Sequence, residues 1–69
     1  MISPLASVDS TAKIGKNVTI QPFAYIEGDV EIGDDCVIMS NASILKGPRL
    51  GKGNKVHLGA VLGSEPQDF

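Results

Sequence analysis

Large aliphatic residues recur at every sixth position from one end of the chain to the other. Stepping by six from position 2 meets only Ile, Val or Leu at eleven consecutive steps. These three residue types make up about a quarter of the chain, so a chance match over eleven positions and six phases is of order one in a million. The column consists of Ile2, Val8, Ile14, Ile20, Ile26, Ile32, Ile38, Ile44, Leu50, Val56 and Leu62.

A second column, mostly small residues, lies four positions after each large one. Ala12 and Ile14, for example, are two residues apart, so both side chains point to the same face of a strand and Lys13 points outward. Each hexad therefore predicts a very short strand followed by a three-residue corner. The corners contain turn-forming residues, as in Gly15-Lys16-Asn17. The small column reads Ala6, Ala12, Val18, Ala24, Val30, Cys36, Ala42, Pro48, Asn54, Ala60 and Pro66.

This pattern excludes a helix and disfavours an open sheet. A period of six separates successive large residues by about 240° on a helix, which makes no apolar stripe. An open sheet of such short strands, with no hairpin signal, would leave many unpaired edges. A solenoid avoids both problems, because the chain turns at each corner and returns to stack on itself about 4.8 Å away.

A longer period of eighteen residues sets the number of sides. Gly15, Gly33 and Gly51 are separated by eighteen, and outward positions at the same spacing alternate in charge, as in Lys13, Glu31 and Arg49. Opposite charges one strand apart stabilise a sheet by a few tenths of a kcal/mol each. We therefore predict an all-β fold, a single-stranded parallel β-helix of hexapeptide repeats with three sides and about 3.7 coils.

Length and composition exclude several classes of protein. The chain has 69 residues, enough for one small domain, and its net charge of −2 argues against a nucleic-acid partner. A single cysteine excludes an internal disulfide and fits a reducing compartment, and one Cys with one His is too few for a zinc or other metal site. The longest apolar run is Cys36–Met39, so we expect no membrane span, and Met1–Pro4 gives no sign of a signal peptide.

Four candidate sites are weighed against structural roles. His57 follows an inward residue, and we favour a surface or subunit-contact role over a general base. Cys36 occupies an inward position, and we favour a small buried side chain over a nucleophile. Asn54 is also inward, and we favour a buried amide bonded to corner backbone over a ligand site. The acidic stretches 27–29 and 34–35 are interpreted as solvated turns, not as a calcium loop.

Apolar residues also occupy outward or corner positions that an isolated prism would expose. Such a surface usually marks an interface or a ligand groove. We favour assembly of three prisms as the explanation. These residues are Leu5, Phe23, Tyr25, Val37, Met39, Leu45, Leu58 and Val61.

The repeat resembles that of the hexapeptide acyltransferases. The hexad Ile14–Thr19 reads Ile-Gly-Lys-Asn-Val-Thr, which has the family's spacing. A narrower resemblance lies in Gly51–Val56 and Ala60–Phe69, and in the opening Met1–Gly15 and Gln21–Ala24. These segments are similar to the acyl-carrier-protein-dependent UDP-N-acetylglucosamine O-acyltransferases of lipid A biosynthesis. The resemblance covers all 69 residues.

The resemblance implies a left-handed coil, whereas the general rule for parallel crossovers would favour a right-handed one. It also implies a cytoplasmic homotrimer that moves a 3-hydroxyacyl chain from acyl carrier protein to the 3-hydroxyl of UDP-N-acetylglucosamine, without a cofactor. By this resemblance Gln67 and Asp68 bind substrate. The family's catalytic histidine has no match here, and His57 does not correspond to it, so we expect residues 1–69 to be an inactive N-terminal part of one β-helix domain.

Three alternatives remain open at this point. The related N-acyltransferase, which acts on UDP-3-O-acyl-glucosamine in the same pathway, is also a trimeric prism, and the Gln67-Asp68 pair speaks against it. A non-catalytic solenoid that binds a partner would lack affinity for the nucleotide sugar. A metal-dependent prism enzyme would need several histidines, and the chain has one.

Overall fold

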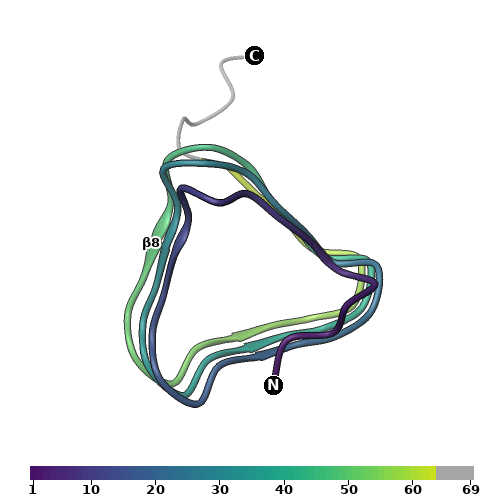
Figure 1. The fold of residues 1–69 in the computed structure, drawn as a ribbon, viewed down its shortest axis with the longest axis horizontal. Helices are drawn as coiled ribbons and strands as arrows, with labels where there is room; N and C mark the ends of the chain where they lie inside the picture. The colour runs from purple at the N-terminus through teal and green to yellow at the C-terminus, as the bar shows by residue number, and fades with distance from the viewer. Residues whose placement is uncertain (64–69) are drawn as a thin grey trace.

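The computed structural model describes residues 1–63, which wind into a three-sided prism (Figure 1). Ten strands of two residues each form its sides, and the described residues contain no helix. The strands are Ser7–Val8 (β1), Lys13–Ile14 (β2), Thr19–Ile20 (β3), Tyr25–Ile26 (β4), Glu31–Ile32 (β5), Val37–Ile38 (β6), Ser43–Ile44 (β7), Arg49–Leu50 (β8), Lys55–Val56 (β9) and Val61–Leu62 (β10).

Each side of the prism is one parallel sheet. Every third strand stacks, giving the orders β1-β4-β7-β10, β2-β5-β8 and β3-β6-β9. Lys13 pairs with Glu31, and Glu31 pairs with Arg49, each eighteen residues further on. This register confirms the eighteen-residue coil. It also places the outer residue of each strand beside the outer residue of the paired strand in the next coil.

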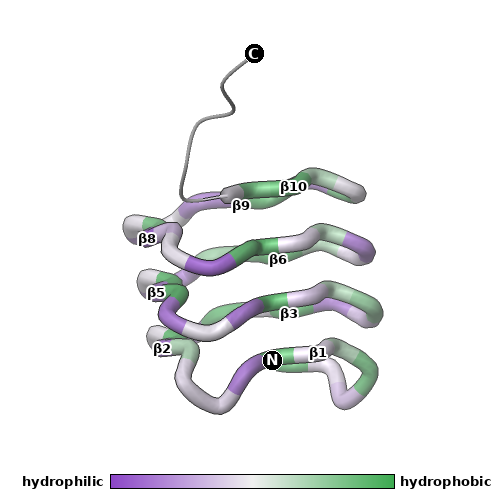
Figure 2. Tube along the Cα trace, turned by 90° about the horizontal axis from the view of Figure 1, so that it is seen from above, coloured by the Kyte–Doolittle hydropathy of each residue, from purple (hydrophilic) through white to green (hydrophobic). Residues whose placement is uncertain are grey.

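The coil is left-handed. In Figure 1 the chain runs counter-clockwise from its N-terminus, and the coils recede from the viewer as they advance. Figure 2 shows the same coils from above, stacked with the N-terminal coil at the bottom. The handedness implied by the family resemblance is confirmed, and the general preference for right-handed crossovers does not hold here.

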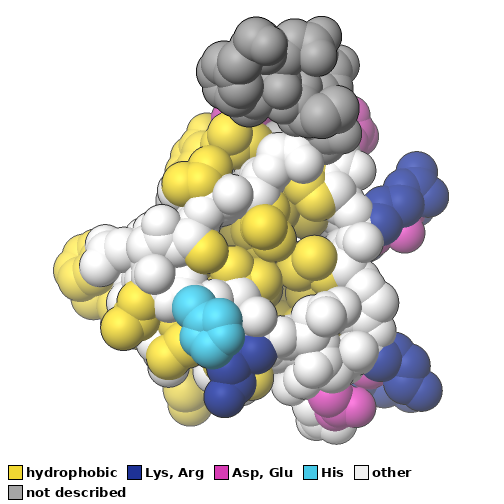
Figure 3. Space-filling model, turned by 180° about the vertical axis from the view of Figure 1, so that it is seen from behind, with side chains coloured by type: hydrophobic (Ala, Val, Ile, Leu, Met, Phe, Trp, Pro, Cys, Tyr) yellow, Lys and Arg dark blue, Asp and Glu magenta, His cyan; other side chains and the backbone are white. Residues whose placement is uncertain are grey.

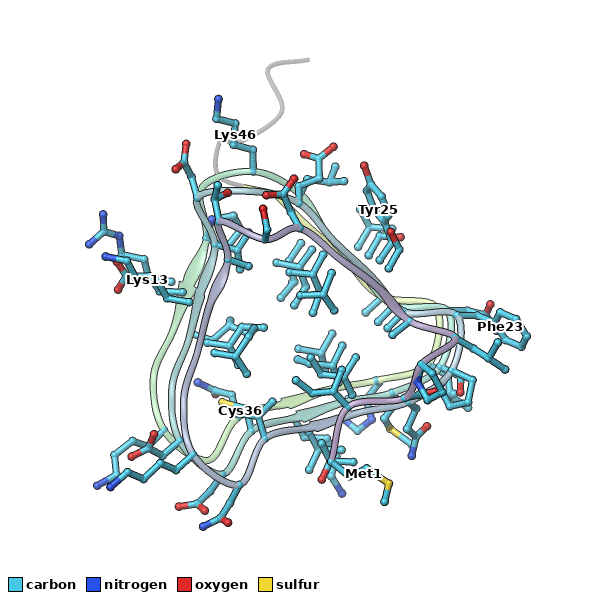
Figure 4. All side chains as sticks on the ribbon, viewed as in Figure 1. Met1, Lys13, Phe23, Tyr25, Cys36 and Lys46 are labelled. Carbon is cyan, nitrogen blue, oxygen red and sulfur yellow. The ribbon has the colours of Figure 1, made fainter. Side chains whose placement is uncertain are left out.

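The core is a stack of inward-pointing columns. Ile20, Ile26, Ile38 and Ile44 are at most 1% exposed, and Figure 4 shows the side-chain columns pointing into the prism. Each such side chain contributes roughly 1.5–3 kcal/mol on burial. The small column lies beside them, and its buried members are Val18, Ala24, Val30, Cys36 and Ala42. The two periodic columns of the sequence are thus the core.

The corners require unusual backbone conformations. Left-handed φ values occur at Asn17, Asp29, Asp35 and Asn41, the residue types that tolerate them best apart from glycine. Phe23 also has a φ of 68°, which is costly for a large side chain. It lies at a corner with its ring pointing outward (Figure 4).

Side chains complete the hydrogen bonding at the corners. A two-residue strand satisfies few backbone groups, so turn N–H groups need other acceptors. Carboxylate and amide oxygens of the neighbouring coil supply them. The bonds run from Lys16 N to Asp34 Oδ1 (2.7 Å), from Lys46 N to Glu27 Oε1 (2.8 Å) and from Ser40 N to Gln21 Oε1 (3.0 Å).

Among residues 1–63 there is no helix long and apolar enough to cross a membrane.

Candidate functional site

The substrate-binding pair expected from the sequence, Gln67 and Asp68, lies outside the described residues. Their roles stay predictions. The described part of the chain therefore bears on function through its surfaces and through the other residues that the sequence singled out.

His57 and Cys36 do not form a catalytic pair. His57 is exposed, as expected, at the corner that follows β9, while Cys36 is fully buried. The Cys36 thiol donates a hydrogen bond to the Gly51 carbonyl oxygen at 3.0 Å. A nucleophile must reach substrate as a thiolate, so the buried, hydrogen-bonded thiol is structural. The favoured interpretation of Cys36 is confirmed.

The prediction that Asn54 is buried is wrong. Its side chain is exposed, because the described residues place no further coil above this position of the small column. The expected bond to corner backbone is present, since Asn54 Nδ2 donates to the Gly51 carbonyl oxygen at 3.0 Å. Asn54 therefore caps its own turn.

An open hollow of about 650 Å³ lies at the corner between the β1 and β2 sheets. Its polar groups already bind one another. Glu27 accepts from the Tyr25 hydroxyl at 3.1 Å as well as from Lys46 N, and Lys46 Nζ lies 3.8 Å from Asp29 Oδ2. Within residues 1–63 no group of three or more His, Cys, Asp or Glu side chains is placed to hold a metal ion. These contacts support the interpretation of stretch 27–29 as a turn.

Two groups in this hollow have shifted pKa values. The hydrogen bond to the Glu27 carboxylate, and then its charge, raise the pKa of the Tyr25 phenol. Hydrogen bonds from the Thr11 backbone N–H and hydroxyl lower the pKa of the Asp9 carboxyl. Tyr25 therefore stays a hydrogen-bond donor and Asp9 stays an acceptor at neutral pH.

One corner of the prism is apolar. Leu5, Phe23 and Leu58 are 61%, 63% and 64% exposed there, and we call these three the apolar corner. Tyr25 and Val61 continue it on the outer face of the adjoining β1-β4-β7-β10 sheet (Figure 4). The exposure predicted for these residues is confirmed, and such a patch suits an interface.

Two other residues expected to be exposed are half-buried. Val37 pairs with Thr19 on one side and Lys55 on the other, so the neighbouring coils flank its side chain. Met39 is also half-buried, at the corner that follows β6. The prediction of full exposure neglected the shielding that an outer column receives from the coils above and below.

Residues 11–46, just over half of the chain, match the family profile described as bacterial transferase hexapeptide (six repeats). The chain belongs to the bacterial hexapeptide transferase family. This membership accounts for the repeat and for the prism, and it confirms the resemblance found in the hexads. A fold of this kind carries several chemistries, so the family alone does not name a substrate.

The relatives of this hexapeptide transferase chain carry a narrower name. The chain is 42% identical over 68 residues to an acyl-[acyl-carrier-protein]–UDP-N-acetylglucosamine O-acyltransferase from Chlamydia caviae, covering 99% of this chain and 24% of the relative. A protein of the same name from Brucella ovis is 37% identical over 67 residues, covering 97% of this chain and 24% of the relative. The chain thus spans about a quarter of the length of the curated relatives it matches.

Two solved structures agree in fold with this chain. The UDP-N-acetylglucosamine acyltransferase from Campylobacter jejuni superposes with a TM-score of 0.92 at 35% identity, covering 100% of this chain and 27% of its own. The Arabidopsis UDP-N-acetylglucosamine acyltransferase gives a TM-score of 0.90 at 30% identity, with coverages of 96% and 23%. The hexapeptide transferase chain is therefore similar in every described coil to enzymes of one named activity.

Sequence reasoning missed the side-chain acceptors at the corners. Gln21, Glu27 and Asp34 appeared only as polar corner residues, yet each accepts a backbone N–H from the neighbouring coil. These acceptors could have been found from their separation in the sequence, because each lies eighteen or nineteen residues from its donor, which is about one coil. An acceptor one coil from a turn N–H can be sought in any sequence of this family.

Proposed function

We propose that this chain is part of an acyltransferase that moves a 3-hydroxyacyl group from acyl carrier protein to the 3-hydroxyl of UDP-N-acetylglucosamine, in lipid A synthesis. One observation carries the proposal: relatives with this name align over nearly the whole chain, and a solved structure of the same named activity superposes on it with a TM-score of 0.92. The name that these relatives carry favours this activity over the N-acyltransferase alternative.

We further propose that residues 1–69 form the N-terminal part of a longer β-helix domain. The relatives' length supports this, because the aligned chain is 24% of the Chlamydia caviae protein. In that arrangement the coils described here act as the scaffold, and Gln67 and Asp68 are the first residues to contact substrate. A carboxylate there would accept hydrogen bonds from sugar hydroxyls.

The chemistry requires a base to take the proton of the attacking sugar hydroxyl and a donor to stabilise the oxyanion. Neither is assigned to the described residues. His57 is exposed at a corner and its backbone carbonyl accepts from Ala60 N, which gives it a turn role. The base therefore belongs to the remainder of the domain, and the chain alone is expected to have no turnover.

The active form in this proposal is a cytoplasmic homotrimer. The apolar corner supports it, since Leu5, Phe23 and Leu58 are all more than 60% exposed at one corner, where three prisms can bury them against one another. The charged column of Lys13, Glu31 and Arg49 lies on another side of the prism, as expected if one side meets sister subunits and the others meet water.

The test is an acyl-transfer assay on the complete protein, with acyl carrier protein charged with a 3-hydroxyacyl chain and with UDP-N-acetylglucosamine. We expect 3-O-acylated product, and Asp68→Ala should lower kcat/KM by at least about tenfold, because the sugar loses a charged hydrogen-bond acceptor. Lys13→Gln, on the outer face of β2, is the control and should keep full activity.

Two outcomes would contradict the proposal. Product acylated at nitrogen of an amino-sugar acceptor, with none from UDP-N-acetylglucosamine, would favour the N-acyltransferase. Absence of nucleotide-sugar binding by the complete protein would favour a non-catalytic solenoid. Separately, turnover by residues 1–69 alone that is lost in His57→Ala would overturn the assignment of the base to the remainder of the domain.

A further inference from the structure

The first three residues lie beneath β3 and pair with it. Ile20 N donates to the Met1 carbonyl oxygen at 2.8 Å, and Ser3 N donates to the Ile20 carbonyl oxygen at 2.8 Å. Met1 N adds a bond to the Val18 carbonyl oxygen at 2.6 Å. Ile2 thus pairs in parallel with Ile20, one coil further on. We call residues 1–3 the N-terminal strap.

The N-terminal strap completes the core on one of the three sides. Above it, Ile20 is 1% exposed and Val18 is 4% exposed. On the other two sides β1 and β2 are the first strands of their sheets, and no described segment pairs beneath them. Their inward residues, Val8 and Ile14, are only half-buried. The difference in burial therefore follows the strap.

The strap also occupies backbone groups that the edge of β3 would otherwise present. An uncovered strand edge is a row of unpaired N–H and C=O groups, and another chain can pair with it. Here the strap uses the Ile20 N–H and the carbonyl oxygens of Val18 and Ile20. Pro4 follows the strap and has no N–H, and Leu5 N donates to Ser3 Oγ at 3.1 Å. The chain that leaves the strap is thus a poor template for pairing.

The rest of the first coil is protected by side chains. Lys13 is exposed on the outer face of β2, and an edge lysine opposes pairing with another strand because the ammonium must stay in water. At the corner between β1 and β2, Thr11 N donates to Asp9 Oδ1 at 2.8 Å, which satisfies a turn donor. Each side of this end therefore has few backbone groups to offer.

The opposite end of the prism is different. Figure 3 looks onto that end and shows hydrophobic side chains uncovered in its middle. Leu50 and Leu62, the inward residues of β8 and β10, are half-buried there, and no segment within residues 1–63 covers them. Such an end suits the continuation of the β-helix proposed above. The strap is a feature of the N-terminal end alone among the described residues.

We propose that the N-terminal strap blocks end-to-end pairing of this prism with a second copy. A second copy is the partner, because its uncovered strand edges have the same three-sided cross-section and the same spacing of parallel strands. The proposal depends on the contacts of the first coil and not on the acyl-transfer assignment. Pairing through an end would add to any assembly through the apolar corner, so the two can be told apart.

Two test variants release the strap in different ways. Ser3→Pro removes the N–H that bonds to the Ile20 carbonyl oxygen, because proline has no backbone N–H. Ile2→Gly removes the side chain that pairs with Ile20 and makes the strap flexible, without inserting a proline. Ser3→Ala is the matched control, since it keeps the backbone donor and removes only the hydroxyl that accepts from Leu5 N.

Two measurements separate release of the strap from its consequence. Amide hydrogen exchange is followed at Ile20, with Gly33 as the reference because its N–H bonds to the Leu50 carbonyl oxygen between higher coils. In the test variants exchange at Ile20 should rise at least about tenfold and at Gly33 less than about twofold. Sedimentation velocity should then show species larger than the wild type that increase with concentration. Ser3→Ala should match the wild type in both measurements.

Three outcomes would each overturn the proposal. Unchanged exchange at Ile20 in both test variants would show that the strap does not protect β3. Faster exchange at Ile20 without larger species would show that the released edge does not pair with a second copy. Equal acceleration at Ile20 and Gly33 in both variants would show that residues 1–3 support the whole prism and have no separate role at its edge.

Discussion

Gly33 shows how single residues set the spacing between coils. A Cβ atom added at this position would lie 2.7 Å from the backbone carbon of Gly51 and 2.9 Å from the carbonyl oxygen of Leu50. Backbone atoms cannot move aside as the end of a flexible side chain can. The glycine column seen in the sequence is thus a requirement for close contact between corners, in addition to a turn preference.

We predict that Gly33→Ala destabilises the chain by roughly 2–3 kcal/mol, because the second and third coils must separate at this corner. Gly53→Ala is the matched control. Gly53 has a φ of 71°, and no described atom beyond its chain neighbours lies within 4 Å of the position that an added methyl group would take, so only backbone strain of about 1 kcal/mol is expected. Urea unfolding followed by circular dichroism measures both, and equal losses would contradict the steric argument.

At the scale of elements, no strand of this protein is stable by itself. Each has two residues, and its partners are the strands of the coils above and below. Burial of one inward residue per strand supplies the stabilisation, with Ile32 in β5 only 2% exposed. The outer residue of each strand faces away from the core, and in the β2-β5-β8 sheet these residues are Lys13, Glu31 and Arg49, whose charges alternate in register.

We predict that Ile32→Asp abolishes cooperative folding, because it places an unpaired charge inside the prism at a cost of several kcal/mol. Lys13→Asp is expected to cost less than about 1 kcal/mol, since this side chain is exposed and its neighbour Glu31 lies in high dielectric. Thermal unfolding of both variants tests the inside–outside assignment. Losses of similar size would argue against it.

Much of the arrangement of the strands could be predicted from the sequence. The six- and eighteen-residue periods identify every strand, its inward residue and its partners, because the same physical pattern repeats ten times. Departures occur where a residue's environment is not periodic. Asn54 is exposed because no described coil covers it, and Val37 is shielded by neighbours that the hexad pattern treats as equivalent. The corner acceptors depend on side-chain reach, which hydrophobic periodicity does not encode.

The whole molecule is polarised around its axis as well as along it. The apolar corner occupies one side of the prism, and the charge column of Lys13, Glu31 and Arg49 occupies another. Phe23 stands out at the apolar corner, because its φ of 68° costs roughly 1 kcal/mol or more and its ring is 63% exposed. An exposed aromatic held in a costly conformation is a good anchor for a sister subunit.

We predict that Phe23→Asp converts a trimer of this chain to monomers, since it places a charge in the surface that three prisms would bury. Leu45→Asp, at another corner and 36% exposed, should remain trimeric. Sedimentation velocity on the two variants and the wild type distinguishes these states. A monomeric wild type, or a trimeric Phe23→Asp variant, would contradict the assembly.

The eighteen-residue register has a consequence for how such chains can change length. Inserting or deleting a whole coil leaves every inward column, glycine corner and charge column in line. An insertion of six or twelve residues keeps the aliphatic column but rotates all later positions to a different side, and any other length destroys the core unless a corner absorbs it as a loop. Viable length variants should therefore differ by multiples of eighteen within the prism, with other changes confined to corners that bulge outward. The molecule can thus grow and shrink in units of about 4.8 Å, one coil at a time.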